Sequence, residues 1–172
     1  MSKGALRLPD ALAAQILLAA ARAYPAECCG LLEGLEDTEG WSVTALHESA
    51  NLAEEPARRF MIDPALQFAL LHRLRGTNRR IVGCFHSHPG GHAEPSAEDA
   101  RQAYETGFLY AIAGGAPETG FALAAYVWEG CLDLEHESRE RCIECTIAVV
   151  DVRARSGSGC EVDDGIEQHA DT

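Results

Sequence analysis

The sequence predicts an α+β protein, close to α/β, with a single mixed, largely antiparallel β-sheet flanked by helices. Helix-like and strand-like segments alternate along most of the chain, and several strand-like segments follow one another towards its end. The 172 residues, of which 47% are hydrophobic and 24% charged, suit one globular domain with a sizeable core. No internal repeat suggests a solenoid.

The first half of the chain predicts two helices among short strands. Pro9 and Asp10 form a helix-start signal, and the helix should end before Tyr24 and Pro25, because proline cannot continue it. In chain order we expect a strand at 6–8, this first helix, a buried strand at 28–32 stopped by Gly34, a strand at 41–46, a loop at 49–59, an extended piece at 60–62 and a helix opened by Asp63 and Pro64.

The second half predicts one more helix and four strands. We expect a strand at 81–86, a helix from Ser96 to about residue 106, and strands at 108–113, 121–127 and 131–136, with turns at Gly114-Gly115 and Glu129-Gly130. The domain should therefore span residues 1–137. Residues 138–150 form an extension that is either helical or strand-like. Residues 151–172 form a tail, acidic and linker-like, that we expect to be disordered.

Charge and cysteine content narrow the function classes. The net charge of −13 disfavours a nucleic-acid partner, which requires a basic surface. No apolar run approaches the roughly 20 residues that cross a bilayer, and no signal peptide is expected at the N-terminus. Seven cysteines is an odd, scattered set, unlike a secreted disulfide framework. We therefore expect no membrane partner and a reducing, cytoplasmic location.

Two histidines followed by an aspartate form the most informative stretch. If His86 and His88 lie on a strand, they point the same way, because side chains alternate between its faces. Pro89 and the glycines after it turn the chain, so that Asp99 in the next helix can supply a third ligand atom. Three such ligands, with the fourth position left to water, are typical of a catalytic zinc site. The stretch predicts a metallohydrolase.

The same residues also fit a purely structural interpretation. Ser96 and Asp99 have the spacing of a capping box, in which the two side chains satisfy backbone groups at a helix start. Two nearby histidines can likewise be hydrogen-bonded core residues. Spacing alone leaves both interpretations open.

A metallohydrolase of this kind also needs a general base. Glu27 lies just before the apolar run at 28–32, and a carboxyl group that is partly desolvated there has a raised pKa suited to acid–base chemistry. Taken alone, Glu27 can equally be a solvated loop acid.

Taken together, these residues resemble the JAMM (MPN-plus, JAB-type) zinc metallopeptidases, in particular their short bacterial members. The family pattern is a Glu, then HSHP, then PSxxD, and Glu27, residues 86–89 and residues 95–99 match it. The resemblance covers residues 6–136 and extends to the flanking stretches 25–32 and 60–64. It implies the MPN/JAMM fold, which is similar to that of cytidine deaminases.

The resemblance also implies a role for each matched residue. His86, His88 and Asp99 would bind one zinc ion, Zn2+, with water as its fourth ligand. Glu27 would be the catalytic acid and base, and Ser96 would help to stabilise the oxyanion formed on the attacked carbonyl.

Family members cleave after the C-terminal diglycine of ubiquitin or ubiquitin-like proteins. The resemblance therefore implies a zinc-dependent isopeptidase or peptidase whose substrate and partner is a ubiquitin-like, sulfur-carrier-type protein. We expect the groove for the substrate tail within residues 41–59. A non-catalytic MPN-type scaffold or binding module and a metal amidase for a small molecule remain the alternatives.

The cysteines suggest weaker possibilities. Cys28 and Cys29 with a histidine would suit a thiol peptidase, but adjacent cysteines in an apolar strand favour core residues. Cys84 shares a strand face with the two histidines and is either a fourth ligand or a small core residue. Cys142 and Cys145 have metal-ligand spacing, although a single CxxC pair favours free thiols.

Overall fold

The computed structural model describes residues 5–38, 40–103, 107–128 and 147–149. The expected strand at 131–136, the turn at Glu129-Gly130, the cysteines at 142 and 145 and the tail at 151–172 lie outside the described residues.

A seven-stranded mixed sheet, ordered β1-β3-β2-β4-β5-β6-β7, forms the centre of the described fold. The elements are β1 (Ala5–Arg7), α1 (Asp10–Ala23), β2 (Cys29–Asp37), β3 (Gly40–Ser49), α2 (Pro64–Leu74), β4 (Arg80–Pro89), α3 (Ala97–Gln102), β5 (Leu109–Ala116), β6 (Gly120–Trp128) and β7 (Ile147–Val149). The pairs β1·β3 and β4·β5 are parallel, and every other neighbouring pair is antiparallel. The predicted α+β class and the mixed, largely antiparallel sheet are therefore confirmed.

Two glycine predictions are wrong. Gly34 does not stop β2; it lies at a shift in the β2·β3 register, where a Cβ would come within 2.2 Å of the Ser42 carbonyl oxygen. Glycine there permits a bulge rather than an end. Gly114 and Gly115 lie inside β5 and pair with β6, and the turn to β6 comes only after Ala116.

One helix boundary differs from its prediction, and one segment that the sequence left open is a strand. The third helix ends at Gln102, because Ala103 is already extended (φ −69°, ψ 123°) and its N–H bonds to the Asp99 carbonyl. In the extension at 138–150, whose structure the sequence left open between helix and strand, Ile147–Val149 pairs with β6 as a strand.

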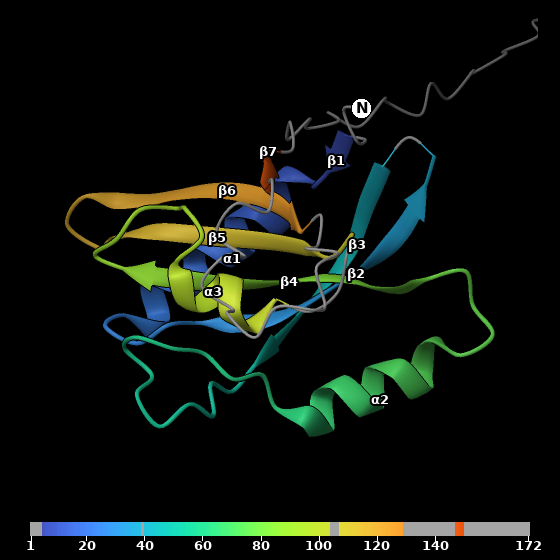
Figure 1. Cartoon of the computed structure of the whole chain (residues 1–172), viewed down its shortest axis with the longest axis horizontal. Helices are drawn as coiled ribbons and strands as arrows, with labels where there is room; N and C mark the ends of the chain where they lie inside the picture. Colours follow the sequence, from blue (N-terminus) through green and yellow to red (C-terminus); the bar gives the residue numbers. More distant parts are fainter. Residues whose placement is uncertain (1–4, 39, 104–106, 129–146, 150–172) are drawn as a thin grey trace, which may run out of the picture.

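Helices cover both faces of the sheet. Side chains along each strand point alternately to one face and the other, so each face carries its own part of the core. Figure 1 shows α1 behind the sheet and α3 in front of it. On the α1 face, Leu32 and Phe85 join Ile16 in the larger apolar cluster. On the other face, Leu31 and Cys84 pack with Leu70 and Leu74 of α2. Neighbours in sequence thus point to opposite faces, as the two-residue period of a strand requires.

None of the helices in the described residues is long and apolar enough to span a membrane.

A buried carboxylate joins α2 to the sheet away from the histidine motif. Glu33 of β2 is only 3% exposed. Its Oε2 lies 2.9 Å from His47 Nε2 and also accepts a hydrogen bond from Arg73 of α2, while its Oε1 lies 3.2 Å from Arg79 Nη1. Burial raises the pKa of the Glu33 carboxyl, but the hydrogen bonds from His47 and Arg79 and the charge of Arg73 outweigh burial and hold that pKa below its usual range.

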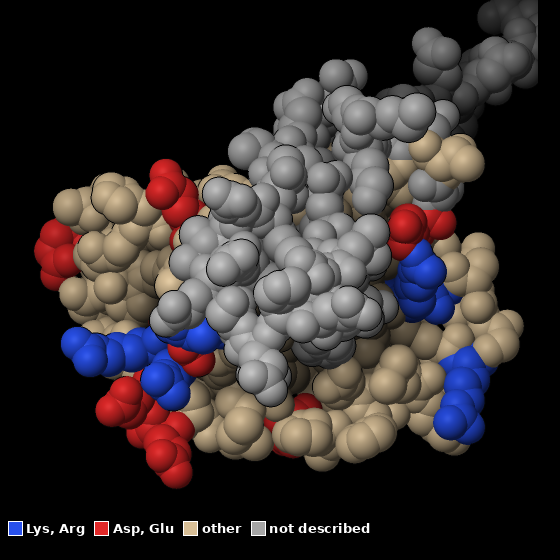
Figure 2. Space-filling view, in the orientation of Figure 1, with Lys and Arg blue, Asp and Glu red and all other residues tan. Residues whose placement is uncertain are grey.

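Basic side chains occur in small groups rather than in one continuous surface on the face shown in Figure 2, where grey atoms do not cover it. Part of this positive charge is neutralised by nearby acids, since Arg73 and Arg79 bind Glu33 and Arg80 binds Glu36.

We predict that Glu33→Gln lowers the free energy of unfolding by about 1–3 kcal/mol at pH 7, because the substitution removes the charge that Arg73 and Arg79 face. The folded-state pKa lies below the unfolded-state value, so this stabilisation is fully present above about pH 4.3 and is lost as the pH falls through the folded-state pKa. Urea unfolding of the native protein and the variant at pH 7 and at several pH values below 4 measures the difference.

Glu36→Gln is the matched control. It removes the ion pair with Arg80, whose side chain is 58% exposed, and should cost at most about 1 kcal/mol. Equal losses in the two variants, or a loss in Glu33→Gln that does not shrink at low pH, would contradict the role given to Glu33.

Candidate metal centre

The central strand β4 carries both histidines of the motif on one face. Cys84, His86 and His88 alternate with Phe85 and Ser87 along the strand, so the histidines face the same side as α2. The His86 side chain is fully buried and that of His88 is 15% exposed. β2 pairs with β4 as far as His86, and β5 pairs with it as far as Pro89, so strand pairing holds the backbone of both histidines.

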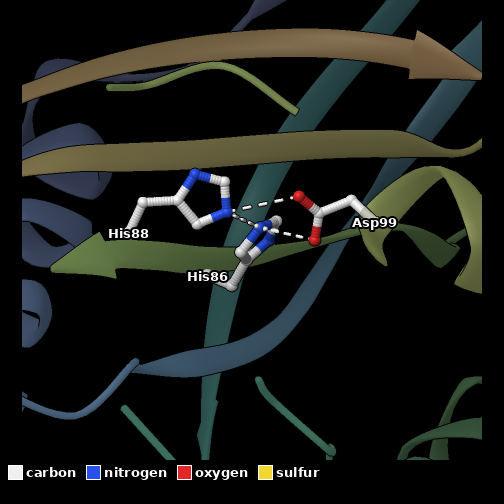
Figure 3. A group of neighbouring side chains, drawn as sticks. All are labelled: His86, His88 and Asp99. Carbon is white, nitrogen blue, oxygen red and sulfur yellow. Dashed lines mark hydrogen bonds and ion pairs between the residues drawn. The ribbon is translucent and has the colours of Figure 1, made fainter. Parts of the chain in front are cut away.

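The third side chain comes from α3. Gly90, with a φ of +70°, turns the chain after β4, and Ser96 then caps α3 so that Asp99 lies in its first turn. Asp99 is buried, with Oδ1 3.1 Å from His86 Nε2 and Oδ2 3.2 Å from His88 Nε2. The two Nε2 atoms are 3.0 Å apart. Figure 3 shows the three side chains converging on one point from β4 and α3.

The structure combines both interpretations of Ser96 and Asp99. Ser96 Oγ accepts a hydrogen bond from the Asp99 backbone N–H (3.1 Å), and Asp99 Oδ2 accepts one from the Ser96 backbone N–H (2.6 Å), so the capping box is present. The Ser96 hydroxyl also donates to Asp99 Oδ2 (2.7 Å). The cap thus orients the same carboxylate that faces the histidines.

The donor set suits a cation of the zinc type. Ligand atoms of His86, His88 and Asp99 all lie within 4.8 Å of one another. Burial raises the pKa of Asp99, but hydrogen bonds from the two histidines outweigh it and hold that pKa well below its usual range, so Asp99 is a carboxylate. Burial lowers the pKa of His86, which favours the neutral imidazole that a metal requires. Two imidazoles and one carboxylate are ordinary zinc ligands.

The two rings are held in different ways. His86 is stacked against Phe60, with ring centroids 4.4 Å apart, and within the described residues its buried Nδ1 has no hydrogen-bond partner. Packing therefore orients His86. His88 Nδ1 lies 3.2 Å from the His92 carbonyl oxygen, so a hydrogen bond directs its Nε2 towards Asp99.

Two residues that hold the His92 carbonyl in place, Tyr126 and Gly114, were not predicted from the sequence. Tyr126 Oη donates to the Ala93 carbonyl (2.7 Å), which ties residues 92–93 to β6. Gly114 of β5 lies directly beneath the same segment, where a Cβ would come within 2.2 Å of the His92 carbonyl carbon and the Ala93 nitrogen. The only signal in the sequence was a pair of glycines at the end of an apolar strand, which also suits a turn.

Glu27 is a buried acid rather than a solvated loop residue. It is 6% exposed, and burial raises the pKa of its carboxyl to about 7, while the charge of His88 lowers that pKa and the charge of Asp99 raises it. The carboxyl of Glu27 is thus near enough to His88 and Asp99 for their charges to shift its pKa. A carboxyl group with a pKa near neutrality can both accept and return a proton.

The three described cysteines, Cys28, Cys29 and Cys84, are buried core residues. Cys84 packs with Leu31, Leu70 and Leu74, and burial raises the pKa of its thiol. Burial likewise raises the pKa of Cys29 to about 12 and that of Cys28 above its usual value, which disfavours the thiolate that a thiol peptidase needs.

A groove runs beside the site along the loop between β3 and α2. It is lined by residues 52–55 and 59–61 together with Gln102, and we call it the loop groove. Phe60 and Met61 also line a second hollow that reaches Cys84 and Tyr110. His86, His88 and Asp99 together are called the candidate metal group. Since Phe60 stacks on His86, the loop groove adjoins this group.

We predict that Gly114→Ala weakens zinc binding by about 10- to 100-fold, because the new methyl group displaces the segment whose carbonyl orients His88. Tyr126→Phe should weaken it less, since only one hydrogen bond to that segment is lost. Competition against a chromophoric chelator measures both affinities, and circular dichroism checks folding.

The control is Gly76→Ala, at a positive-φ glycine with no atom within 4 Å of the position of a Cβ. It should leave zinc affinity unchanged. A folded Gly114→Ala variant that binds zinc as tightly as the native protein would show that His88 does not depend on this segment.

Comparisons with known proteins show similarity in sequence and in fold. A desampylase from Haloferax volcanii is 35% identical over 106 residues, which are 62% of this chain and 72% of the relative. A solution structure from Desulfitobacterium hafniense matches with a TM-score of 0.68 and 25% identity, over 87% of this chain and 94% of the other. One from Salinibacter ruber matches with a TM-score of 0.55 and 29% identity, over 96% and 97%.

Residues 9–126 match the family described as prokaryotic homologs of the JAB domain. This span contains β4, the turn after it and α3, and therefore His86, His88 and Asp99, as well as the buried Glu27. The chain belongs to the prokaryotic JAB family.

Proposed function

We propose that this chain is a zinc-dependent isopeptidase that cleaves the amide bond after the C-terminal diglycine of a ubiquitin-like, sulfur-carrier-type protein. The observation that carries the proposal is a buried glutamate with a pKa near 7 beside a converging His/His/Asp group. A base and a set of metal ligands in one place are what metal-assisted hydrolysis needs.

Zinc bound by His86, His88 and Asp99 would supply Lewis-acid polarisation of the scissile carbonyl and acidify water in the site. In this proposal Glu27 performs the proton transfers. Its carboxylate accepts a proton from water as the water oxygen bonds to the carbonyl carbon. The C–N bond then breaks, and Glu27 returns the proton to the departing amine, so the carboxylate is regenerated.

Ser96 is proposed to donate a hydrogen bond to the oxygen of the attacked carbonyl. In the structure its hydroxyl donates to Asp99 Oδ2 instead, at 2.7 Å. The oxyanion role therefore requires the hydroxyl to turn its proton from Asp99 towards the substrate. The capping bond from the Asp99 N–H to Ser96 Oγ can persist during this turn, because it uses an oxygen lone pair.

The substrate assignment rests on the loop groove and on the relative. Two glycines carry no side chains, so a diglycine tail can lie extended in a narrow groove and be held by main-chain hydrogen bonds. The name of the Haloferax relative, desampylase, denotes a hydrolase that removes a ubiquitin-like modifier. A cytoplasmic location is part of the proposal, and the free thiols of Cys28, Cys29 and Cys84 support a reducing compartment.

We predict that Glu27→Gln lowers kcat by about 100- to 10,000-fold while zinc content stays unchanged, because the amide cannot accept the proton. The probe is a ubiquitin-like carrier joined through its diglycine to a reporter, with products read by mass. Native activity should fall as the pH drops below the pKa of Glu27. That pKa is about 7 without metal and lower with a bound cation, and the variant should lack this acid limb.

Glu118→Gln serves as the control, since Glu118 is an exposed acid in the turn between β5 and β6 and does not line the loop groove. It should keep kcat near the native value. Native-like cleavage by the Glu27→Gln variant would remove Glu27 from the mechanism.

We predict that the purified chain binds one zinc ion, and that chelation abolishes cleavage of the carrier probe until zinc is restored. His88→Ala should lose most of the bound zinc, because it removes one of three donors. His92→Ala is the control, since its side chain is exposed and its backbone carbonyl, which orients His88, remains. Atomic absorption measures the metal content.

The same measurements separate the alternative functions. A folded chain that takes up no zinc and cleaves nothing is a scaffold or binding module. A zinc-loaded chain that leaves the carrier probe intact but hydrolyses a small amide is a metal amidase.

A further inference from the structure

The side chain of Asn51, which is not part of the candidate metal group, links the loop groove to Glu27 by hydrogen bonds. Asn51 follows the end of β3 and is half-buried. Its Nδ2 donates to the carbonyl oxygens of Glu27 (3.0 Å) and Arg59 (2.9 Å), and its Oδ1 accepts from the backbone N–H groups of Ala53 (3.0 Å) and Met61 (3.1 Å). A longer contact joins Nδ2 to the Pro56 carbonyl oxygen (3.4 Å). Both ends of the amide are therefore fully used.

These hydrogen bonds make residues 51–62 a closed unit. Four of the five backbone partners of Asn51 belong to residues 53–61, and three of these four, Ala53, Arg59 and Met61, line the loop groove. Asn51 also forms a β-bridge with Ile62, and the Leu52 N–H donates to the Met61 carbonyl (2.9 Å). The loop is thus held at its base by Asn51 rather than by packing alone.

The same unit holds the backbone of Glu27. The Glu27 N–H donates to the Pro56 carbonyl (2.7 Å), and the Glu27 carbonyl accepts from Asn51. Both backbone groups of Glu27 are therefore bound to the loop or to its base. The residue after Glu27, Cys28, is hydrogen-bonded to Ser87 of β4, the strand that carries His86 and His88.

We propose that Asn51 is a positioning residue that couples the loop groove to Glu27, so that the groove wall and the catalytic base are held in one hydrogen-bonded unit. The inference rests on the proposed role of Glu27 as the base. It assigns Asn51 no contact with the reacting atoms; Asn51 acts through Glu27.

Asn51→Asp is the test variant. It keeps the size of the side chain and the Oδ1 acceptor for Ala53 and Met61, but it replaces the donor by an oxygen that faces the carbonyls of Glu27 and Arg59. Ser49→Ala is the matched control. Ser49 Oγ accepts from the Asp63 N–H (2.9 Å) at the same end of β3, so this variant also loosens the loop base but leaves the bonds to Glu27 intact.

Hydrogen exchange measures the coupling without using activity. In Asn51→Asp the Glu27 amide should exchange at least about tenfold faster than in the native protein, because its acceptor Pro56 belongs to the loosened loop. Ser49→Ala should leave that amide unchanged. Unchanged exchange at Glu27 in Asn51→Asp would overturn the proposal. If Asn51→Asp does not fold, Asn51→Ser, which adds no charge, is measured in its place.

A double-mutant cycle tests whether the coupling serves catalysis. Asn51→Asp should lower kcat for the carrier probe about 10- to 100-fold in the native background, with zinc content unchanged, but less than about threefold in the Glu27→Gln background. Equal losses in both backgrounds, or a change in KM alone, would make Asn51 only a structural residue of the loop. A native protein that cleaves no probe refutes the proposed function instead, and the exchange result still decides the coupling.

Discussion

Two hydrogen bonds between Ser87 and Cys28 join the halves of the site. The Cys28 N–H donates to Ser87 Oγ (2.8 Å), and the Ser87 N–H donates to the Cys28 carbonyl (3.1 Å). Ser87 lies between the two histidines, and Cys28 follows Glu27 directly. A buried contact between β4 and the residue that precedes β2 therefore links the candidate metal group to the proposed base. Asn51 holds Glu27 from the opposite side, so the residue has little freedom to move.

Three buried carboxyl groups have different pKa values because their surroundings differ. Glu33 faces two arginines and a histidine and keeps its charge. Asp99 faces two histidines and a helix cap and also keeps its charge. Glu27 has a pKa near 7, because burial outweighs the charge of His88. Carboxyl groups whose pKa values are pushed apart in this way are suited to different tasks, here structural support by Glu33 and the proposed roles of Asp99 in metal binding and of Glu27 in proton transfer.

The site also depends on close contact between the backbone of residues 92–93 and that of Gly114. Residues 92–93 lie against Gly114 so tightly that no side chain fits between them, and the His92 carbonyl thereby reaches His88. A strand glycine normally weakens a sheet. At this position it allows the loop that follows the histidines to reach back over β5 and β6.

The sequence by itself determined the α+β class, the two main helices, the central strand and the motif residues 86–99, because apolar periodicity, cap signals and short motif spacings are local properties. The tertiary structure decided the burial of Glu27, the joint use of Asp99 as helix cap and candidate ligand, and the roles of Gly114 and Asn51. Each of these depends on contacts between segments far apart in the chain, and the pKa of a carboxyl group or the clearance above a glycine exists only once those segments have packed together.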